Sequence, residues 1–451
     1  MPTQPPTAIP PFVGVLPEAQ RIAGLAWPVT LGQVALVGMG TVDVIVVGQL
    51  GAEALAGFAL ANVLSFSVLA PGLGAAMGLD PFFTRAHGSG DRRATGTTLV
   101  RGAVLLALLA VPMTAVHLLA GPLLSIAGQD PAILPIAESC SLAMALRVVP
   151  FLGFSLIRQL LQAAGSMRPA MVVAVMANLV NLVADVWLVG GGLGVPAFGA
   201  VGAAWSTTVV QAFMFAVLWA LAAAPMREAL AAADRPTVAG VVAVARTSLP
   251  VAAQLTVEIW AFNAASLLAG AIGAVALAAH TAALNIASLA FMFPLGVGAA
   301  GATRVGNLVG AGRPWRQSGW TTVGVGLSCM AVSASVFLLI PGPLARVYTS
   351  DPGVVALTVA VLPIAAAFQI VDGTQVTAAG VLRGVGDTRV PFLINLVAHW
   401  ALGLPVGAAL AFGAGLGLPG LWLGLSVGLS ATAVLLMARI HTVRPERSLE
   451  G

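Results

Sequence analysis

Four carboxylates stand inside long apolar runs of the sequence: Asp43, Asp185, Glu258 and Asp372. A carboxylate at the centre of a membrane-spanning helix costs roughly 2.5 to 3.5 kcal/mol on insertion scales, and such residues usually face the interior of a helix bundle. Packing does not require them, because uncharged side chains fill the same space without this penalty. Carboxylate oxygens bind Na⁺, or take up a proton where burial favours the neutral acid. We therefore expect these residues to bind a cation.

Amide side chains accompany two of the carboxylates at helical spacing. Gln254 precedes Glu258 by one turn, which places both on one face of a helix. Gln369 and Gln375 lie three residues before and three residues after Asp372, so a polar stripe follows that helix. The sequence predicts that these amides take part in the same site.

A similar stripe occurs in the first half of the chain, where Asn178, Asn181 and Asp185 are spaced three and four residues apart. Asn and Gln in membrane helices also form hydrogen bonds that hold helices together. That structural role stays open for Asn178, and for Gln254 and Gln375.

Other polar residues in the apolar runs are less informative. His280 and His399 are isolated, and we expect structural roles for them. Arg147 and Arg158 either balance the buried carboxylates or extend toward the membrane surface, and the sequence does not choose. Trp260 stands close to Glu258 and either packs or lines a cavity.

The composition sets the class of protein. The 451 residues are 59% hydrophobic and 8% charged, whereas a soluble domain has about 25% charged residues. Apolar runs of about 20 residues recur, each long enough to cross roughly 30 Å of hydrocarbon as a helix. Gly and Pro lie inside these runs, as membrane helices tolerate. We predict an all-α polytopic membrane protein with about twelve transmembrane helices.

The basic residues define an orientation. All of them are Arg, and they concentrate in alternate connections such as "RAHGSGDRR" and "RGVGDTR", while "GAE", "GQDPA" and "TSDPG" lie between. The positive-inside rule places the Arg-rich connections and both termini in the cytoplasm. The arginines are scattered over short loops, which argues against nucleic-acid binding. Cys140 and Cys329 fall in apolar runs and read as small buried side chains.

The chain repeats itself at one constant offset. Leu50-Gly51-Ala52 corresponds to Ile272-Gly273-Ala274, and at the same offset "GSG" at 88–90 corresponds to "GAG" at 310–312. Halves of about six helices have the same orientation, which is the parallel-repeat plan of a secondary transporter. The predicted organisation is a flexible Pro-rich tail at 1–20, an N-lobe at 21–223, a cytoplasmic linker at 224–246, a C-lobe at 247–438 and a cytoplasmic tail at 439–451.

Three stretches carry a resemblance to a known family: "QVALVGMGTVDVIVVGQLGAEALAG", "HTAALNIASLAFMFPLGVGAAGATRVGNLVGAG" and "VDGTQVTAAGVLRGVGDT". With them the chain resembles the MATE family of multidrug and toxic compound extrusion transporters, and its NorM-type branch most. The resemblance implies twelve transmembrane helices in two pseudo-symmetric six-helix lobes that form a V around a central cleft. It also implies efflux of cationic or amphipathic drugs in exchange for Na⁺ or H⁺. We further expect a monomer in the bacterial inner membrane, in contact with lipid.

The resemblance assigns roles to particular residues. Glu258 and Asp372, with Gln254 and Gln369 beside them, match cation-coupling positions of the C-lobe. Asp43, Asn181, Asp185 and Thr207 match those of the N-lobe. Na⁺ is therefore expected at Glu258 and Asp372, or at Asp43, Asn181 and Asp185. Residues expected to line the substrate cleft are Asn178, Trp260, Asn285, Phe368 and Gln375.

One residue departs from the family pattern. Relatives of the NorM type can have a Tyr one turn before the aspartate that Asp372 matches, and here that position is Phe368. The missing hydroxyl weakens the expectation of Na⁺ coordination in the C-lobe. The sequence does not choose the coupling site or the ion.

Two other functions compete with the transporter. A lipid-linked precursor flippase of the same broad superfamily would need a basic cleft, and Arg147 and Arg158 keep that alternative open. An intramembrane enzyme would need a nucleophile–base pair or a motif such as H-E-x-x-H, and neither is present. We expect no enzymatic activity and no cofactor apart from the coupling ion.

Overall fold

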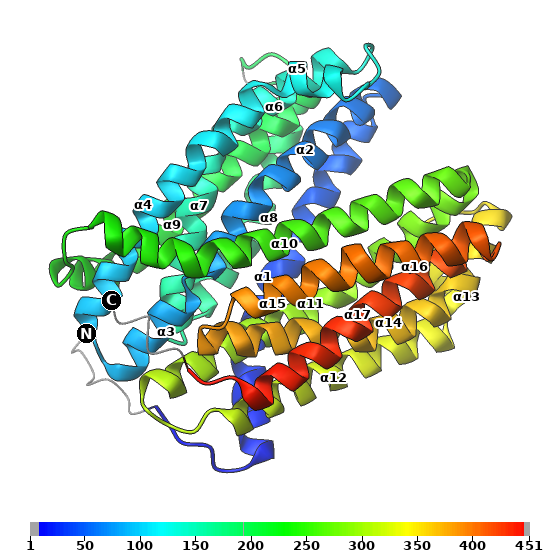
Figure 1. The fold of residues 1–451 in the computed structure, drawn as a ribbon. Helices are drawn as coiled ribbons and strands as arrows, with labels where there is room; N and C mark the ends of the chain where they lie inside the picture. The colour runs from blue at the N-terminus through cyan, green and yellow to red at the C-terminus, as the bar shows by residue number, and fades with distance from the viewer. Residues whose placement is uncertain (1–8, 193, 446–451) are drawn as a thin grey trace. The chain divides into compact units, whose positions relative to one another are not determined.

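The computed structural model describes residues 9–192 and 194–445, so parts of both predicted tails lie outside the described residues (Figure 1). Regular structure in this range is helical apart from an antiparallel bridge between Gly192 and Val195. The helices of the first half are α1 Val15–Gly48, α2 Ala52–Met77, α3 Asp80–Ser89, α4 Arg92–Leu118, α5 Ala120–Ile126, α6 Leu134–Ala145, α7 Val148–Ala163, α8 Arg168–Gly190 and α9 Ala200–Ala231. Those of the second half are α10 Val238–Ile272, α11 Ala274–Gly310, α12 Arg316–Leu339, α13 Pro341–Arg346, α14 Pro352–Val385, α15 Arg389–Leu396, a π-helical turn Val397–Gly403, α16 Leu404–Ala408, a second π-helical turn Ala409–Gly413 and α17 Gly417–Thr442.

Most of these helices are long and apolar enough to cross a membrane. The described residues contain 11 such spans, or 12 if α6 and α7, which meet at a 46° bend, form one span. Pro150 explains the bend, because its ring clashes with the carbonyl of Leu146 and it has no N–H to donate. The prediction of an all-α polytopic membrane protein is confirmed.

Two compact units make up the chain. The N-unit consists of Leu31–Phe83 and Asp91–Ala252. The C-unit consists of the described residues up to Thr30, Thr84–Gly90, and those from Ala253 onward. The boundaries therefore differ from the predicted lobes at 21–223 and 247–438. The first turns of α1 and the end of α3 pack with the second half of the sequence, although the chain order places them in the first.

The N-unit is organised around α9. Helices α8, α7, α6 and α4 all pack along it, and α2 packs on α6. The predicted linker at 224–246 is largely helical, since α9 runs to Ala231 and α10 begins at Val238. Arg93 at the start of α4 donates to Asp234 in the intervening turn at 2.7 Å. This hydrogen bond lowers the pKa of the exposed Asp234 carboxyl and fixes the turn on the N-unit.

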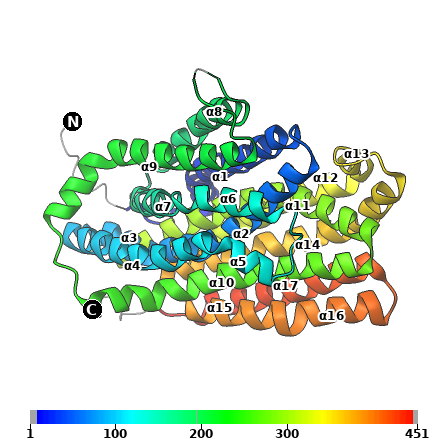
Figure 2. The ribbon, with the colours of Figure 1, turned by 90° about the horizontal axis from the view of Figure 1, so that it is seen from above.

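Helix α14 is the centre of the C-unit, where it packs against α11, α12 and α17 (Figures 1 and 2). A methyl group on Gly380 or Gly384 would come closer than 3.0 Å to the backbone of Gly298 or Ala302 on α11. Glycines four residues apart allow membrane helices to approach this closely. In lipid, packing rather than the hydrophobic effect drives the association of helices.

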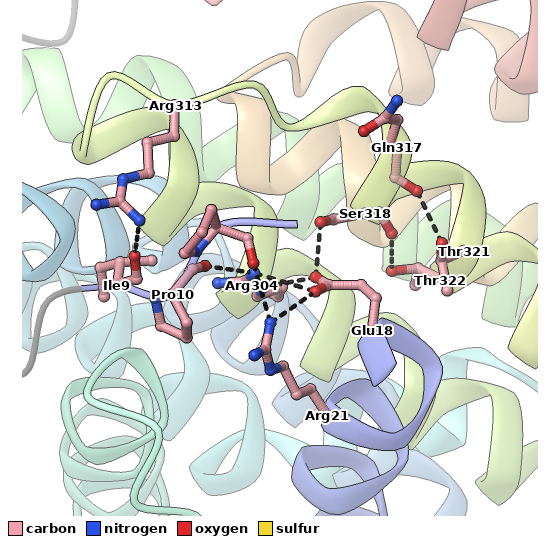
Figure 3. A network of polar contacts seen from close by, with 11 residues as sticks. Ile9, Pro10, Glu18, Arg21, Arg304, Arg313, Gln317, Ser318, Thr321 and Thr322 are labelled. Carbon is pink, nitrogen blue, oxygen red and sulfur yellow. Dashed lines mark hydrogen bonds and ion pairs between the residues drawn. The ribbon is translucent and has the colours of Figure 1, made fainter. Parts of the chain in front are cut away.

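A buried ion pair fixes the start of α1 in the C-unit (Figure 3). Arg304 of α11 donates from Nε to Glu18 Oε1 at 2.6 Å, and Ser318 of α12 donates to the same oxygen at 2.6 Å. Arg304 also donates to the carbonyl of Pro10 at 2.7 Å. The predicted tail at 1–20 is thus partly structured: α1 begins at Val15, and the segment before it is held by arginines.

Breaking this ion pair is expected to destabilise the protein. The side chains of Glu18 and Arg304 are 0% and 6% exposed, and removing one partner of a buried pair costs about 3–5 kcal/mol because the other charge stays uncompensated. Glu18→Gln should lower the thermal unfolding midpoint of the detergent-solubilised protein. Arg21→Gln is the control, because Arg21 meets Glu18 at 3.4 Å and is 35% exposed. An equal loss in both variants would contradict this assignment.

Candidate cation sites

The first site, the N-site, lies inside the N-unit and consists of Asp43, Asn181, Asp185, Ser206 and Thr207. Asn181 of α8 donates from Nδ2 to Asp43 Oδ1 at 2.8 Å. Thr207 Oγ1 lies 3.2 Å from Asp43 Oδ2 and 3.0 Å from the carbonyl of Ala203. Its single proton reaches one of these acceptors at a time, so the second donor to Asp43 is switchable. Helices α1, α8 and α9 all contribute to the site.

Asp185 carries the unsatisfied charge of the N-site. Its side chain is fully buried, and neither carboxylate oxygen receives a hydrogen bond from the described residues. It interacts electrostatically with Asp43, which is itself 4% exposed. The Oδ1 atom of Asn181 also lacks a donor. The carboxylate of Asp185 repels that of Asp43, and no donor offsets this repulsion at Asp185, so the site favours a proton or a bound cation.

Arg147 belongs to a separate polar chain in the N-unit. Its NH2 group donates to Ser65 Oγ at 2.6 Å, and Ser65 Oγ lies 2.9 Å from His117 Nε2. The Nδ1 atom of His117 lies 2.9 Å from the carbonyl of Met113, which assigns the proton to Nδ1 and leaves Nε2 to accept from Ser65. Arg147 also interacts electrostatically with Asp43. It is therefore a counter-charge, held by hydroxyl and imidazole groups. Arg158 lies elsewhere on α7 and contacts Gln33 at 3.4 Å.

The second site, the C-site, lies inside the C-unit and consists of Glu258, Asp372, Gln375 and Asn395. Gln375 Nε2 donates to Glu258 Oε1 at 2.9 Å and lies 3.5 Å from Asp372 Oδ1, so one amide spans both carboxylates. Asn395 of α15 donates to Glu258 Oε2 at 3.3 Å. The Oε1 atom of Gln375 and the Oδ1 atom of Asn395 have no donor among the described residues. The C-site is therefore rich in acceptors as well.

Several residues predicted from the sequence lie outside both sites. Gln369 donates to the carbonyl of Ala287 at 3.0 Å, and Asn178 donates to the carbonyl of Ala35 at 3.0 Å, so both hold helices together. Within the described residues, neither Gln254 nor Asn285 forms a hydrogen bond with a site carboxylate.

The two aromatic residues predicted for the cleft have different environments. Phe368 is buried in an aromatic core, with ring centroids 6.1 Å from Phe262 and 5.3 Å from Trp422. This environment indicates a packing role for Phe368. Trp260 is 52% exposed, as expected of a residue on the outer or cavity face of α10.

The structure adds two residues that the sequence reasoning did not select. Ser206 directly precedes Thr207, and its hydroxyl lies 3.5 Å from Asn181 Nδ2. Asn395 precedes the π-helical turn Val397–Gly403, and π-helical turns frequently mark functional sites. Ser206 could have been selected from the sequence, because it is a polar residue directly before Thr207. Nothing local in the sequence connects Asn395 to Glu258, 137 residues earlier.

Comparison with known proteins covers nearly the whole chain. A family model described as MatE matches residues 28–187 and 250–409. The chain is 35% identical to the multidrug resistance protein NorM of Burkholderia vietnamiensis, with 94% of each protein covered. It is 33% identical to the multidrug resistance protein PmpM of Pseudomonas aeruginosa, covering 94% of this chain and 91% of the relative.

Solved structures share the fold. The eukaryotic MATE transporter AtDTX14 superposes with a TM-score of 0.86 at 22% identity, covering 96% of this chain and 98% of its own. A MATE protein crystallised in complex with MaD3S superposes with a TM-score of 0.85 at 19% identity, covering 96% and 99% of the two chains.

Asn181→Ala is expected to weaken cation binding, because Asp43 loses its closest donor. Hydrogen bonds to charged groups contribute about 1.5–3 kcal/mol, which corresponds to a loss of affinity of about tenfold to hundredfold. Titration of the purified protein with Na⁺ and with acid, followed by tryptophan fluorescence, measures this loss. Asn178→Ala, one turn away on the same helix, should lower the unfolding temperature and leave the affinity unchanged. Equal losses of affinity in both variants would refute the N-site.

Proposed function

Because this chain belongs to the MatE family, we propose that it is a secondary active efflux antiporter, which exports cationic or amphipathic compounds in exchange for Na⁺ or H⁺ by alternating access. Relatives named as multidrug resistance proteins cover 94% of the chain and support this cargo class. The observation that carries the mechanism is a pair of carboxylates in each unit: Asp43 with Asp185, both buried, and the half-buried Glu258 with the buried Asp372.

The N-site is the proposed position of the coupling cation. Neither oxygen of Asp185 receives a hydrogen bond from the described residues, whereas Glu258 receives one on each oxygen. The charge of Asp185 therefore depends more on a bound cation or proton than that of Glu258. Neutralising Asp185 removes its repulsion with Asp43 and frees the Thr207 hydroxyl to move between its two acceptors. A cation that binds one arrangement of these groups better than another shifts the population of conformations.

The C-site is the proposed binding site for the cargo. A cationic drug lowers the energy of Glu258 and Asp372. The cation in the N-site and the drug in the C-site favour different conformations, so each weakens the binding of the other, which is the thermodynamic requirement for exchange. An acceptor-rich site in an apolar unit imposes few directional contacts, which suits a broad range of amphipathic cargo.

The chain is an integral membrane protein, by its apolar spans and its family. We place it in the bacterial inner membrane as a monomer with both termini in the cytoplasm. The bacterial relatives and the concentration of Arg in alternate connections support this orientation.

Efflux of ethidium from cells tests the function. Cells making the wild type should export the dye, and Asp185→Asn should reduce the rate at least tenfold at matched membrane levels, because the amide carries no charge for the cation to neutralise. Glu228→Gln is the matched control, since Glu228 is a surface carboxylate with a side chain 51% exposed. Wild-type cells that retain ethidium and every other cationic dye tried would overturn the efflux proposal.

Glu258→Gln separates the roles of the two sites. If the C-site binds cargo, this variant should raise the dye concentration needed for half-maximal efflux while Na⁺ or acid still alters the tryptophan fluorescence of the purified protein. Proteoliposomes with either a Na⁺ or a proton gradient then identify the ion. Loss of the cation response in Glu258→Gln and its retention in Asp185→Asn would contradict the proposal, because the coupling cation would then bind in the C-site and not in the N-site.

A further inference from the structure

Two segments related by the internal repeat pack against each other in the C-unit. The end of α3 and the turn after it read "TRAHGSG" at 84–90, and the end of α11 and the turn after it read "GNLVGAG" at 306–312. The constant offset of the repeat aligns the two segments position by position, from 84 with 306 to 90 with 312. Thr84–Gly90 is the short piece of the first half that clusters with the C-unit.

The contact between these segments is itself two-fold symmetric. A methyl group on Gly88 would come closer than 3.0 Å to the carbonyl oxygen of Asn307, and one on Gly310 would come closer than 3.0 Å to that of Arg85. Gly88 and Gly310 are repeat counterparts, and so are Arg85 and Asn307. Each glycine therefore lies on the backbone of the residue three positions before the other glycine, so the two contacts are repeat equivalents.

Neighbouring contacts fix the same arrangement. A methyl group on Gly306 would collide with the Thr84 side chain, so that contact also requires glycine. The guanidinium of Arg85 donates to the carbonyl of Val385 at the C-terminal end of α14. Cationic side chains commonly bind the last carbonyls of a helix, which have no partner within it.

The chain connects this contact in the C-unit directly to the N-unit. Thr84–Gly90 belongs to the C-unit, but Phe83 before it and Asp91 after it belong to the N-unit. The segment is thus joined to the N-unit at both ends, through the first turn of α3 and through the start of α4. The surrounding connection, "RAHGSGDRR", is one of those that the positive-inside rule places in the cytoplasm.

We propose that the Gly88–Gly310 contact is the cytoplasmic gate of this transporter, and that it separates whenever the cation sites open toward the cytoplasm. The proposal rests on transport by alternating access. Each glycine lies closer to the opposite backbone than any larger residue would allow. Gly88 and Gly310 are therefore needed for closure, and a methyl group on either should favour the separated state.

Distance measurement between spin labels tests the gate without any transport assay. Ser89→Cys and Ala311→Cys introduce labels at repeat-related positions beside the contact, in a background with Cys140→Ala and Cys329→Ala. In lipid nanodiscs the labels should show a short and a long distance, with proportions that respond to Na⁺ or pH. Gly310→Ala should raise the ratio of long to short at least tenfold. One unchanged short distance under all conditions and in Gly310→Ala would overturn the proposal.

Matched variants guard against a general loss of structure. Gly324→Ala adds a methyl to a helical glycine with nothing within 4 Å of the new atom, so its distances should equal those of the parent. Gly88→Ala, the repeat counterpart, should reproduce the effect of Gly310→Ala, and it serves if Gly310→Ala does not fold. A shift in Gly324→Ala as large as in either gate variant would also overturn the proposal.

Cross-linking ties the gate to transport. Joining the two introduced thiols with a short reducible reagent should abolish ethidium efflux in proteoliposomes, and reduction should restore it. Efflux at the full rate while cross-linked would refute the gate and leave the efflux proposal intact. Two distances that respond to Gly310→Ala in a protein that exports no dye would support the gate and refute drug efflux.

Discussion

The absence of water inside the hydrocarbon layer constrains everything else in this structure. A carboxylate there has no solvent to hydrate it, so its partners must come from the protein or from a bound ion. Glu18 meets this requirement fully, with Arg304 and Ser318 both donating to it. Asp185 does not, because no described residue donates to either of its oxygens. The first arrangement is structural, and the second is the reason for proposing that a cation or proton binds at Asp185.

The internal repeat retains certain glycines and not the acidic residues of the candidate sites. At the offset that pairs Gly88 with Gly310, the positions equivalent to Asp43, Asp185, Glu258 and Asp372 hold no acid at all: they are Ala265, Gly407, Leu36 and Pro150. The glycines at 88 and 310 kept their identity, because each lies against the backbone of the other segment. A close helix contact tolerates one residue type, whereas a binding site is moved by changing a few side chains on an unchanged scaffold. The two candidate cation sites therefore differ in composition although the sequences of the helices around them are related by the repeat.

Hydrogen-bond geometry also separates residues that look alike in the sequence. Asn178 and Asn181 lie on the same face of α8, yet one binds backbone carbonyls and the other binds Asp43. Gln254 does have helical spacing to Glu258, but the amide that donates to Glu258 comes from a different helix and is Gln375. Side chains in a bundle pair across helices at least as readily as along them, and the sequence records only the pairs along a helix.

The sequence by itself determined the class of the fold, the repeat and the identity of the four carboxylates. Apolar runs of sufficient length have one stable form in a membrane, the helix, and a charge inside such a run is conspicuous by its energetic penalty. The tertiary structure alone decided which carboxylates share a site with which amides, since Asp43 meets Asn181 and Glu258 meets Asn395 across 138 and 137 residues. It also decided that Thr84–Gly90 packs with the second half, because that contact depends on the shape of two backbones brought together by folding, for which a linear sequence has no local signal.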